Sequence, residues 1–244
     1  MRGAAPGAAP EPSGRRPARS AAGSRTAADY TSGMGEQVRS MVILISGTGS
    51  NMQAVARACV EQRWPARVAA VISNRAQAPG LRLAAEMGIA TEVLEPQRNA
   101  GRDAYDQELA RRIDRHAPDA VVLAGFMRVL GEAFVSHYQG RLINVHPSLL
   151  PAFPGLHTHR RALEAGVKWH GATVHLVSAE VDAGPIVDQA VVAVQDDDTE
   201  ASLAARVLQQ EHRIYPPAVR ALLEGRLRLA GRRVRTLATA RDAA

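Results

Sequence analysis

Short apolar segments alternate with helix-like segments from residue 41 to residue 124, and this rhythm limits the fold more than any other feature. Residues 42–45 form a continuous apolar run, which is typical of a strand buried on both faces of a parallel sheet. Further strands are expected at 68–73, 91–94 and 120–124, with helices near 50–60, 80–87 and 103–116 between them. Successive β-α units predict an α/β fold with a doubly wound, mostly parallel sheet, Rossmann-like in its N-terminal half.

The rhythm changes in the second half. A strand at 142–145 is followed by a proline-rich loop and a helix near 159–165. Residues 172–177 and 186–194 have no long helix between them, so they are expected to pair as antiparallel strands. A long helix is expected at 200–214, and the arginine-rich segment 225–237 alternates as an edge ribbon would. We therefore expect a catalytic domain at 41–227 and an arginine-rich tail at 228–244.

Residues 1–40 are rich in Ala, Gly, Pro, Arg and Ser and lack hydrophobic periodicity. Such a segment buries too little apolar surface to offset the entropy of ordering it. We expect a disordered extension, or upstream sequence ahead of a later start at Met34 or Met41. An organellar transit peptide is the alternative, although the arginines form no amphipathic stripe.

Charge and composition argue against several classes of function. The net charge of +6 comes from the two ends, since residues 1–40 and 225–244 each hold six arginines and few acids. With only 4% aromatic residues, the chain offers little base-stacking surface, so no nucleic-acid partner is expected. No apolar run approaches the roughly 18 residues that span a membrane. The single cysteine, Cys59, excludes an internal disulfide and favours a reducing cytoplasm; it lies on an apolar stripe and is expected to be buried.

A glycine-rich loop, Gly47-Thr-Gly-Ser-Asn51, follows the first strand. Its glycines allow an anion close to the backbone, and the start of the next helix favours negative charge. The third glycine of a dinucleotide fingerprint is replaced by Met52, and no acid ends the second strand. The loop therefore suits a single phosphate, such as that of a ribose 5-phosphate compound, with Ser50 as the helix cap; a plain tight turn is the alternative.

Asn144 and His146 are two positions apart at the end of a predicted strand. Strand alternation places them on one face, about 6–7 Å apart. Pro147 stops the strand, so His146 is expected at the carboxyl edge of the sheet, where open α/β folds bind ligands. A purely structural histidine is the alternative for this position.

The segment Asn144-Val-His-Pro-Ser-Leu-Leu-Pro151 resembles the main motif of the 10-formyltetrahydrofolate-dependent formyltransferases and hydrolases. The similarity continues in chain order and covers nearly the whole region from residue 41 to about 227. Its further segments are Gly47–Asn51, Ala124-Gly-Phe-Met-Arg128, Pro154-Gly-Leu-His-Thr-His159, His170-Gly-Ala-Thr-Val-His175, Val181-Asp-Ala-Gly-Pro185 and Gln210-Glu-His212.

The resemblance implies the formyltransferase fold and an enzyme of purine synthesis. Its reaction would move a formyl group from 10-formyltetrahydrofolate, a co-substrate, to the amine of glycinamide ribonucleotide. No metal, no membrane and no partner beyond these small molecules is implied, and the protein would be a cytoplasmic monomer or homodimer.

The reaction suggests roles for three residues. Attack of an amine on the formyl carbon creates an oxyanion, so the site needs a donor for that oxygen and a group that moves protons near neutral pH. Asn144 can supply the donor and His146 the proton carrier. Asp182, carried over from the family pattern, would orient or polarise His146; a loop carboxylate that caps a turn next to Gly184 is the alternative for this position.

The resemblance also assigns the substrate contacts. The ribonucleotide would be held by Gly49, Ser50, Asn51 and Glu211. The folate would lie against Arg102, Met127, Arg128, Val129, Leu130, Asn144, Ser178, Ala179, Glu180, Val181 and Asp182. Four histidines, at 157, 159, 170 and 175, are expected only to shape the site, with zinc binding as the alternative. The chain departs from the family pattern at Ala183, where some members have glycine, and at Thr48, where asparagine also occurs.

Three rivals remain. Formyltetrahydrofolate deformylases use the same three residues with water as acceptor, but usually carry an additional regulatory domain that residues 1–40 cannot form. Methionyl-tRNA formyltransferase has a C-terminal β-barrel, for which about 17 residues after 227 are too few. An inert folate- or nucleotide-binding protein is disfavoured because Asn144, His146 and Asp182 are all present.

Overall fold

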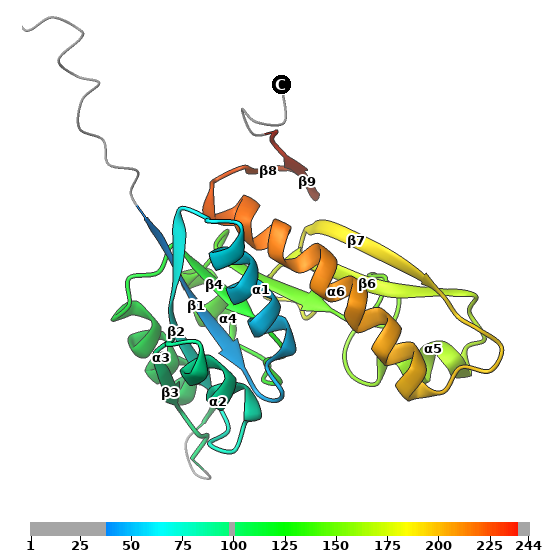
Figure 1. The fold of residues 1–244 in the computed structure, drawn as a ribbon, viewed down its shortest axis with the longest axis horizontal. Helices are drawn as coiled ribbons and strands as arrows, with labels where there is room; N and C mark the ends of the chain where they lie inside the picture. The colour runs from blue at the N-terminus through cyan, green and yellow to red at the C-terminus, as the bar shows by residue number, and fades with distance from the viewer. Residues whose placement is uncertain (1–37, 98–100, 239–244) are drawn as a thin grey trace, which may run out of the picture. The chain divides into compact units, whose positions relative to one another are not determined.

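The structure, a computed structural model, describes residues 38–97 and 101–238 (Figure 1). The extension expected at 1–40 therefore lies, up to residue 37, outside the described residues. Within the described ranges the strands form one nine-stranded sheet in the order β3-β2-β1-β4-β5-β6-β7-β9-β8. The strands are β1 Arg39–Ile45, β2 Ala66–Ser73, β3 Thr91–Val93, β4 Ala120–Leu123, β5 Leu142–His146, β6 Trp169–Leu176, β7 Ile186–Ala193, β8 Leu227–Ala230 and β9 Arg233–Thr236.

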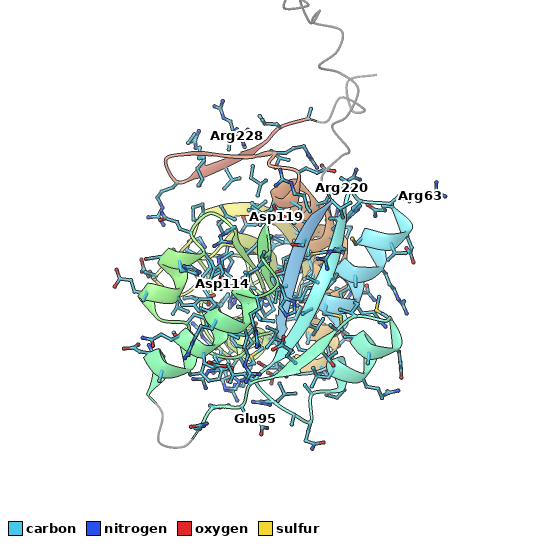
Figure 2. The ribbon with its side chains drawn as sticks, turned by 90° about the vertical axis from the view of Figure 1, so that its left-hand side faces the viewer. Arg63, Glu95, Asp114, Asp119, Arg220 and Arg228 are labelled. Atoms are coloured by element: carbon cyan, nitrogen blue, oxygen red, sulfur yellow. The ribbon has the colours of Figure 1, made fainter. Side chains whose placement is uncertain are left out.

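The sheet confirms the expected fold class. Strands β1 to β5 are parallel, and β6 pairs antiparallel with both β5 and β7. The direction of winding reverses between β1 and β4, and the carboxyl ends of strands at such a switch point are where open α/β sheets bind ligands. In Figure 2, Asp119, which precedes β4, and Glu95, which follows β3, mark the two opposite ends of the parallel strands.

Helices cover both faces of the sheet (Figure 1). The apolar side chains of β1 alternate between two cores: Met41, Ile43 and Ile45 pack with α1, α2 and α6, whereas Val42 and Leu44 pack with α3 and α4. This explains why β1 reads as an uninterrupted apolar run. The helices are α1 Ser50–Glu61, α2 Pro79–Glu86, α3 Arg102–Asp114, α4 Glu132–His137, α5 Thr158–Glu164 and α6 Glu200–Leu223.

The sheet extends beyond the expected domain boundaries at residues 41 and 227. Strand β1 begins at Arg39, where polar contacts replace apolar burial: the Arg39 guanidinium lies 2.7 Å from an Asp119 carboxylate oxygen, and the Ser40 amide donates to the other oxygen. At the far end, β8 and β9 form the predicted ribbon, and β9 meets β7 at the pair Ile186 and Arg233. Figure 2 shows Arg228 on this ribbon.

Two helices differ from expectation. Helix α4 was not predicted, because its six residues are too short for a periodic pattern. Helix α6 continues nine residues beyond the expected end at Ile214 and passes through Pro216 and Pro217. Each proline removes one backbone donor, but buried side chains such as Val219 and Leu223 extend the apolar stripe beyond them, and this burial offsets the loss. In α1, Cys59 is buried as expected, whereas the adjacent Val60 is exposed.

Candidate active site

Strand β5 carries Asn144 and His146 to the carboxyl edge of the parallel strands. Antiparallel pairing with β6 places Asn144 opposite His175 and His146 opposite Thr173. The intervening residues, Val145 and its partner Val174, belong to the core under α1 and α6. Both polar pairs therefore lie on the other face of the sheet, as strand alternation requires.

His146 is buried, and each of its ring nitrogens faces an oxygen. Nε2 lies 3.1 Å from the carbonyl oxygen of Phe153, and Nδ1 lies 3.4 Å from Oδ2 of Asp182. Because a carbonyl oxygen only accepts hydrogen bonds, Nε2 carries a proton in this arrangement. A cationic imidazolium would direct one N–H donor toward each oxygen.

Asp182 comes from the loop between β6 and β7 and also holds a second loop in place. Its Oδ2 accepts the backbone N–H of Gly155 at 2.8 Å. Its backbone lies in the left-handed region, with φ 54°, which aspartate and asparagine tolerate better than most residues. One carboxylate thus links the 153–157 loop to the 178–185 loop beside His146.

His175 fixes the side-chain amide of Asn144, a role that the sequence did not reveal. Asn144 Nδ2 lies 3.2 Å from His175 Nε2, and His175 Nδ1 lies 3.1 Å from the carbonyl oxygen of Leu176. Burial lowers the pKa of His175, against the opposing effects of the Leu176 carbonyl and Asp182, so the ring is neutral near pH 7. With its proton on Nδ1, Nε2 accepts one N–H of Asn144 and leaves the other N–H available.

A cavity of about 490 Å³ adjoins these residues, within the range of small-molecule sites. Its walls include most of the predicted folate residues, together with apolar side chains of the sheet and α4. Met127, Val129 and Val181 line the cavity and are exposed, and exposed apolar side chains around a cavity can contact a ligand. The predicted site residues in its lining are Met127, Arg128, Val129, Leu130, Asn144, His146, Ser178, Ala179, Val181 and Asp182.

Two predicted folate residues, Arg102 and Glu180, do not line this cavity. Arg102 is exposed at the start of α3, and Glu180 is exposed in the β6–β7 loop. Arg128 does reach the cavity, and its guanidinium carbon lies 3.9 Å from the ring centre of Tyr105, within cation–π range. The roles of these three residues toward a folate stay predictions.

The glycine-rich loop lies outside the cavity and forms a second group of predicted residues. Gly49, with φ 78°, takes the cap position of α1, so the expectation that Ser50 caps the helix is wrong: Ser50 is already its first residue. A side chain could not replace the hydrogen of Gly49, because a Cβ there would lie 2.7 Å from the Cα of Gly80. The two backbones are therefore in direct contact at the start of α2.

Asn51 and Glu211, 160 residues apart in sequence, meet beside this loop. Asn51 Nδ2 donates to Glu211 Oε2 at 2.6 Å, and both side chains are buried. Burial raises the pKa of Glu211, against the lowering effect of the Asn51 hydrogen bond. The Oδ1 atom of Asn51 is buried without a partner among the described residues. One of the three predicted ribonucleotide contacts in the loop, Asn51, is thus joined to the fourth, Glu211 on α6.

Three other histidines of the family motifs lie near His146: His157 and His159 line the same cavity, and His170 contacts His159. His170 is buried. Its burial, and to a smaller extent the neighbouring His159, lowers its pKa to about 4. The two rings meet edge to face, 5.3 Å apart. Within the described ranges, no group of three or more histidine, cysteine or carboxylate side chains is arranged to hold a metal ion. No helix of these ranges is both long and apolar enough to cross a bilayer.

Comparison with known proteins identifies the family. A sequence model described as "Formyl transferase" matches residues 39–219. The chain belongs to the formyl transferase family. It is similar to the phosphoribosylglycinamide formyltransferase of Escherichia coli, with 53% identity over 189 residues, covering 78% of this chain and 89% of that protein.

Solved structures agree with this family assignment. Glycinamide ribonucleotide transformylase 1 from Symbiobacterium toebii superposes with a TM-score of 0.80 at 48% identity, covering 84% of this chain and 96% of that one. A formyltetrahydrofolate deformylase from Pseudomonas syringae superposes with a TM-score of 0.77 at 28% identity, covering 83% of this chain and 67% of that one. The formyl transferase described here is therefore an enzyme with the fold of the glycinamide ribonucleotide transformylases.

Proposed function

We propose that this formyl transferase moves the formyl group of 10-formyltetrahydrofolate to the amine of glycinamide ribonucleotide, in purine biosynthesis. The observation that carries the proposal is the convergence of Asn144, His146 and Asp182 at the wall of an apolar cavity. The higher identity to glycinamide ribonucleotide enzymes than to the deformylase supports an amine as acceptor.

The two substrates would enter from different sides of the switch point. The folate would occupy the cavity, with its apolar ring system against Met127, Val129 and Val181. The ribonucleotide phosphate would lie on the amides of the glycine-rich loop at the start of α1. Asn51 and Glu211 would hold its ribose end. The amine and the formyl carbon would then meet at Asn144 and His146.

In the reaction, the lone pair of the amine nitrogen forms a bond to the formyl carbon, and the carbonyl electrons move to the oxygen. The free N–H of Asn144 would donate to this oxyanion, while His175 keeps the amide from rotating. His146, held by the Phe153 carbonyl and facing Asp182, would take a proton from the attacking nitrogen and return one to N10. The oxyanion electrons then re-form the carbonyl bond, the bond between the formyl carbon and N10 breaks with its electron pair on N10, N10 accepts a proton, and tetrahydrofolate leaves.

An acceptor-dependence assay tests the proposal. The enzyme is mixed with 10-formyltetrahydrofolate, and the absorbance of the deformylated folate is followed with and without glycinamide ribonucleotide. We expect product only when the amine is present, in equal amount with formylated ribonucleotide measured by mass spectrometry. Folate product at the same rate in its absence would instead assign the deformylase reaction, in which water accepts the formyl group.

A further inference from the structure

A buried serine connects the loops that would hold the two substrates. Ser46 follows the last residue of β1 and directly precedes Gly47, the first residue of the glycine-rich loop. Only 2% of Ser46 is exposed, so its hydroxyl lies beneath both loops and is not available as a substrate contact. Its hydrogen bonds must therefore be made within the protein.

The hydroxyl of Ser46 has two partners on two other strand ends. It accepts the backbone N–H of Met127 at 2.8 Å, in the loop that follows β4. It donates to Oδ1 of Asn74 at 2.6 Å, just after β2. The backbone N–H of Ser46 also donates to the carbonyl oxygen of Gly125 at 3.1 Å. One residue thus joins the carboxyl ends of β1, β2 and β4.

The direction of these bonds is determined by their partners. A backbone N–H only donates, so the Ser46 oxygen must accept from Met127, and its single proton is then directed to Asn74. Asn74 is also buried, with 7% of its surface exposed. Asn74 therefore fixes the rotation of the hydroxyl, and the hydroxyl in turn fixes the backbone of Met127 at the rim of the cavity.

We propose that Ser46, oriented by Asn74, is a positioning residue that fixes the 125–130 loop for the folate. It touches neither substrate. The proposal rests on the proposed function, because it names how the folate side of that same site keeps its shape. Removing the hydroxyl leaves the Met127 N–H without a partner and allows this loop to move.

The test compares two serine-to-alanine variants on the same strand. Ser46→Ala removes the hydroxyl at the carboxyl end of β1, whereas Ser40→Ala removes a similarly buried hydroxyl at the amino end, where it donates to the Ala117 carbonyl. We expect Ser46→Ala to weaken binding of tetrahydrofolate, measured by calorimetry, about ten-fold, as expected for an orphaned backbone donor. Ser40→Ala should bind tetrahydrofolate as the wild type does, even where both variants lower the melting temperature equally.

Asn74→Ala gives a second, milder perturbation that leaves the Ser46 oxygen in place. It should weaken tetrahydrofolate binding in the same direction, by about three-fold. The double variant should bind no more weakly than Ser46→Ala, because the two residues act as one unit. The KM for glycinamide ribonucleotide should change less than the KM for 10-formyltetrahydrofolate in each variant.

The outcomes separate this proposal from the proposed function. Wild-type tetrahydrofolate binding in both Ser46→Ala and Asn74→Ala would overturn the role of Ser46 while amine-dependent transfer by the wild type stands. Equal weakening by Ser46→Ala and Ser40→Ala would reduce the role of Ser46 to general stability and overturn it too. Wild-type enzyme that binds no tetrahydrofolate and transfers no formyl group would overturn both proposals.

Discussion

Replacing Asp182 by asparagine should separate its charge from its structural contact. Asparagine keeps an oxygen that can accept the Gly155 N–H, and it tolerates the left-handed backbone of this position. It removes the negative charge 3.4 Å from His146 Nδ1. At an effective dielectric constant of about 20, two unit charges at this separation interact by at most about 5 kcal/mol.

We expect Asp182→Asn to lose about half of this maximum interaction energy in the transition state, which corresponds to a fall in kcat of about 10²-fold. Asp182→Ala is the matched variant. It removes both the charge and the hydrogen bond to Gly155, and alanine adopts the left-handed backbone of this position, with φ 54°, less readily than aspartate does. Its kcat should fall at least as far, and its melting temperature should fall several degrees below that of Asp182→Asn. Asp182→Asn with a kcat within two-fold of wild type would refute the electrostatic role of the carboxylate.

Three further predictions address other parts of the site. His146→Ala should lower kcat by at least about 10²-fold while the ribonucleotide still binds, as measured by calorimetry; a near-normal rate would exclude His146 as the proton carrier. Gly80→Ala would place a Cβ 2.9 Å from the Cα of Gly49, so KM for the ribonucleotide should rise about ten-fold or more. Gly101→Ala should leave it unchanged, because no atom of the described residues beyond its chain neighbours lies within 4 Å of a Cβ added there. Because the pKa of His170 falls from 6.5 to about 4 on folding, the unfolded chain binds this proton first as the pH falls. The contribution of His170 to stability should therefore be constant above about pH 7 and decline between about pH 6.5 and 4, by up to about 3 kcal/mol. His170→Gln should flatten this decline in urea unfolding measurements, and an unchanged slope would contradict the assignment.

The sequence was most informative where a local pattern determines the structure. The apolar run of β1 predicts a strand with a core on each face, and both cores are present. The spacing of Asn144 and His146 predicts two side chains on one face at a strand end, and the pairing of β5 with β6 gives this arrangement. These features depend on neighbouring residues only, so one sequence suffices to find them.

Features that depend on distant contacts could not be predicted. The register that sets Asn144 opposite His175 is a property of two strands, and no local pattern encodes it. The bond between Asn51 and Glu211 spans 160 residues, and the family resemblance could assign both residues to the ribonucleotide without indicating that they touch. The start of β1 was missed because Arg39 and Ser40 are stabilised by Asp119, a partner 79 or more residues away.

The pairing of β5 with β6 also determines where the chain tolerates length changes. Side chains alternate across a strand, so a single residue inserted in β6 ahead of His175 would turn the imidazole to the side packed on α6 and leave the Asn144 amide free to rotate. An insertion in the turn after α5, before β6 starts at Trp169, would leave the strand alignment intact. Related enzymes should therefore vary in length in that turn, while the number of residues from the beginning of β6 to the histidine equivalent to His175 stays fixed.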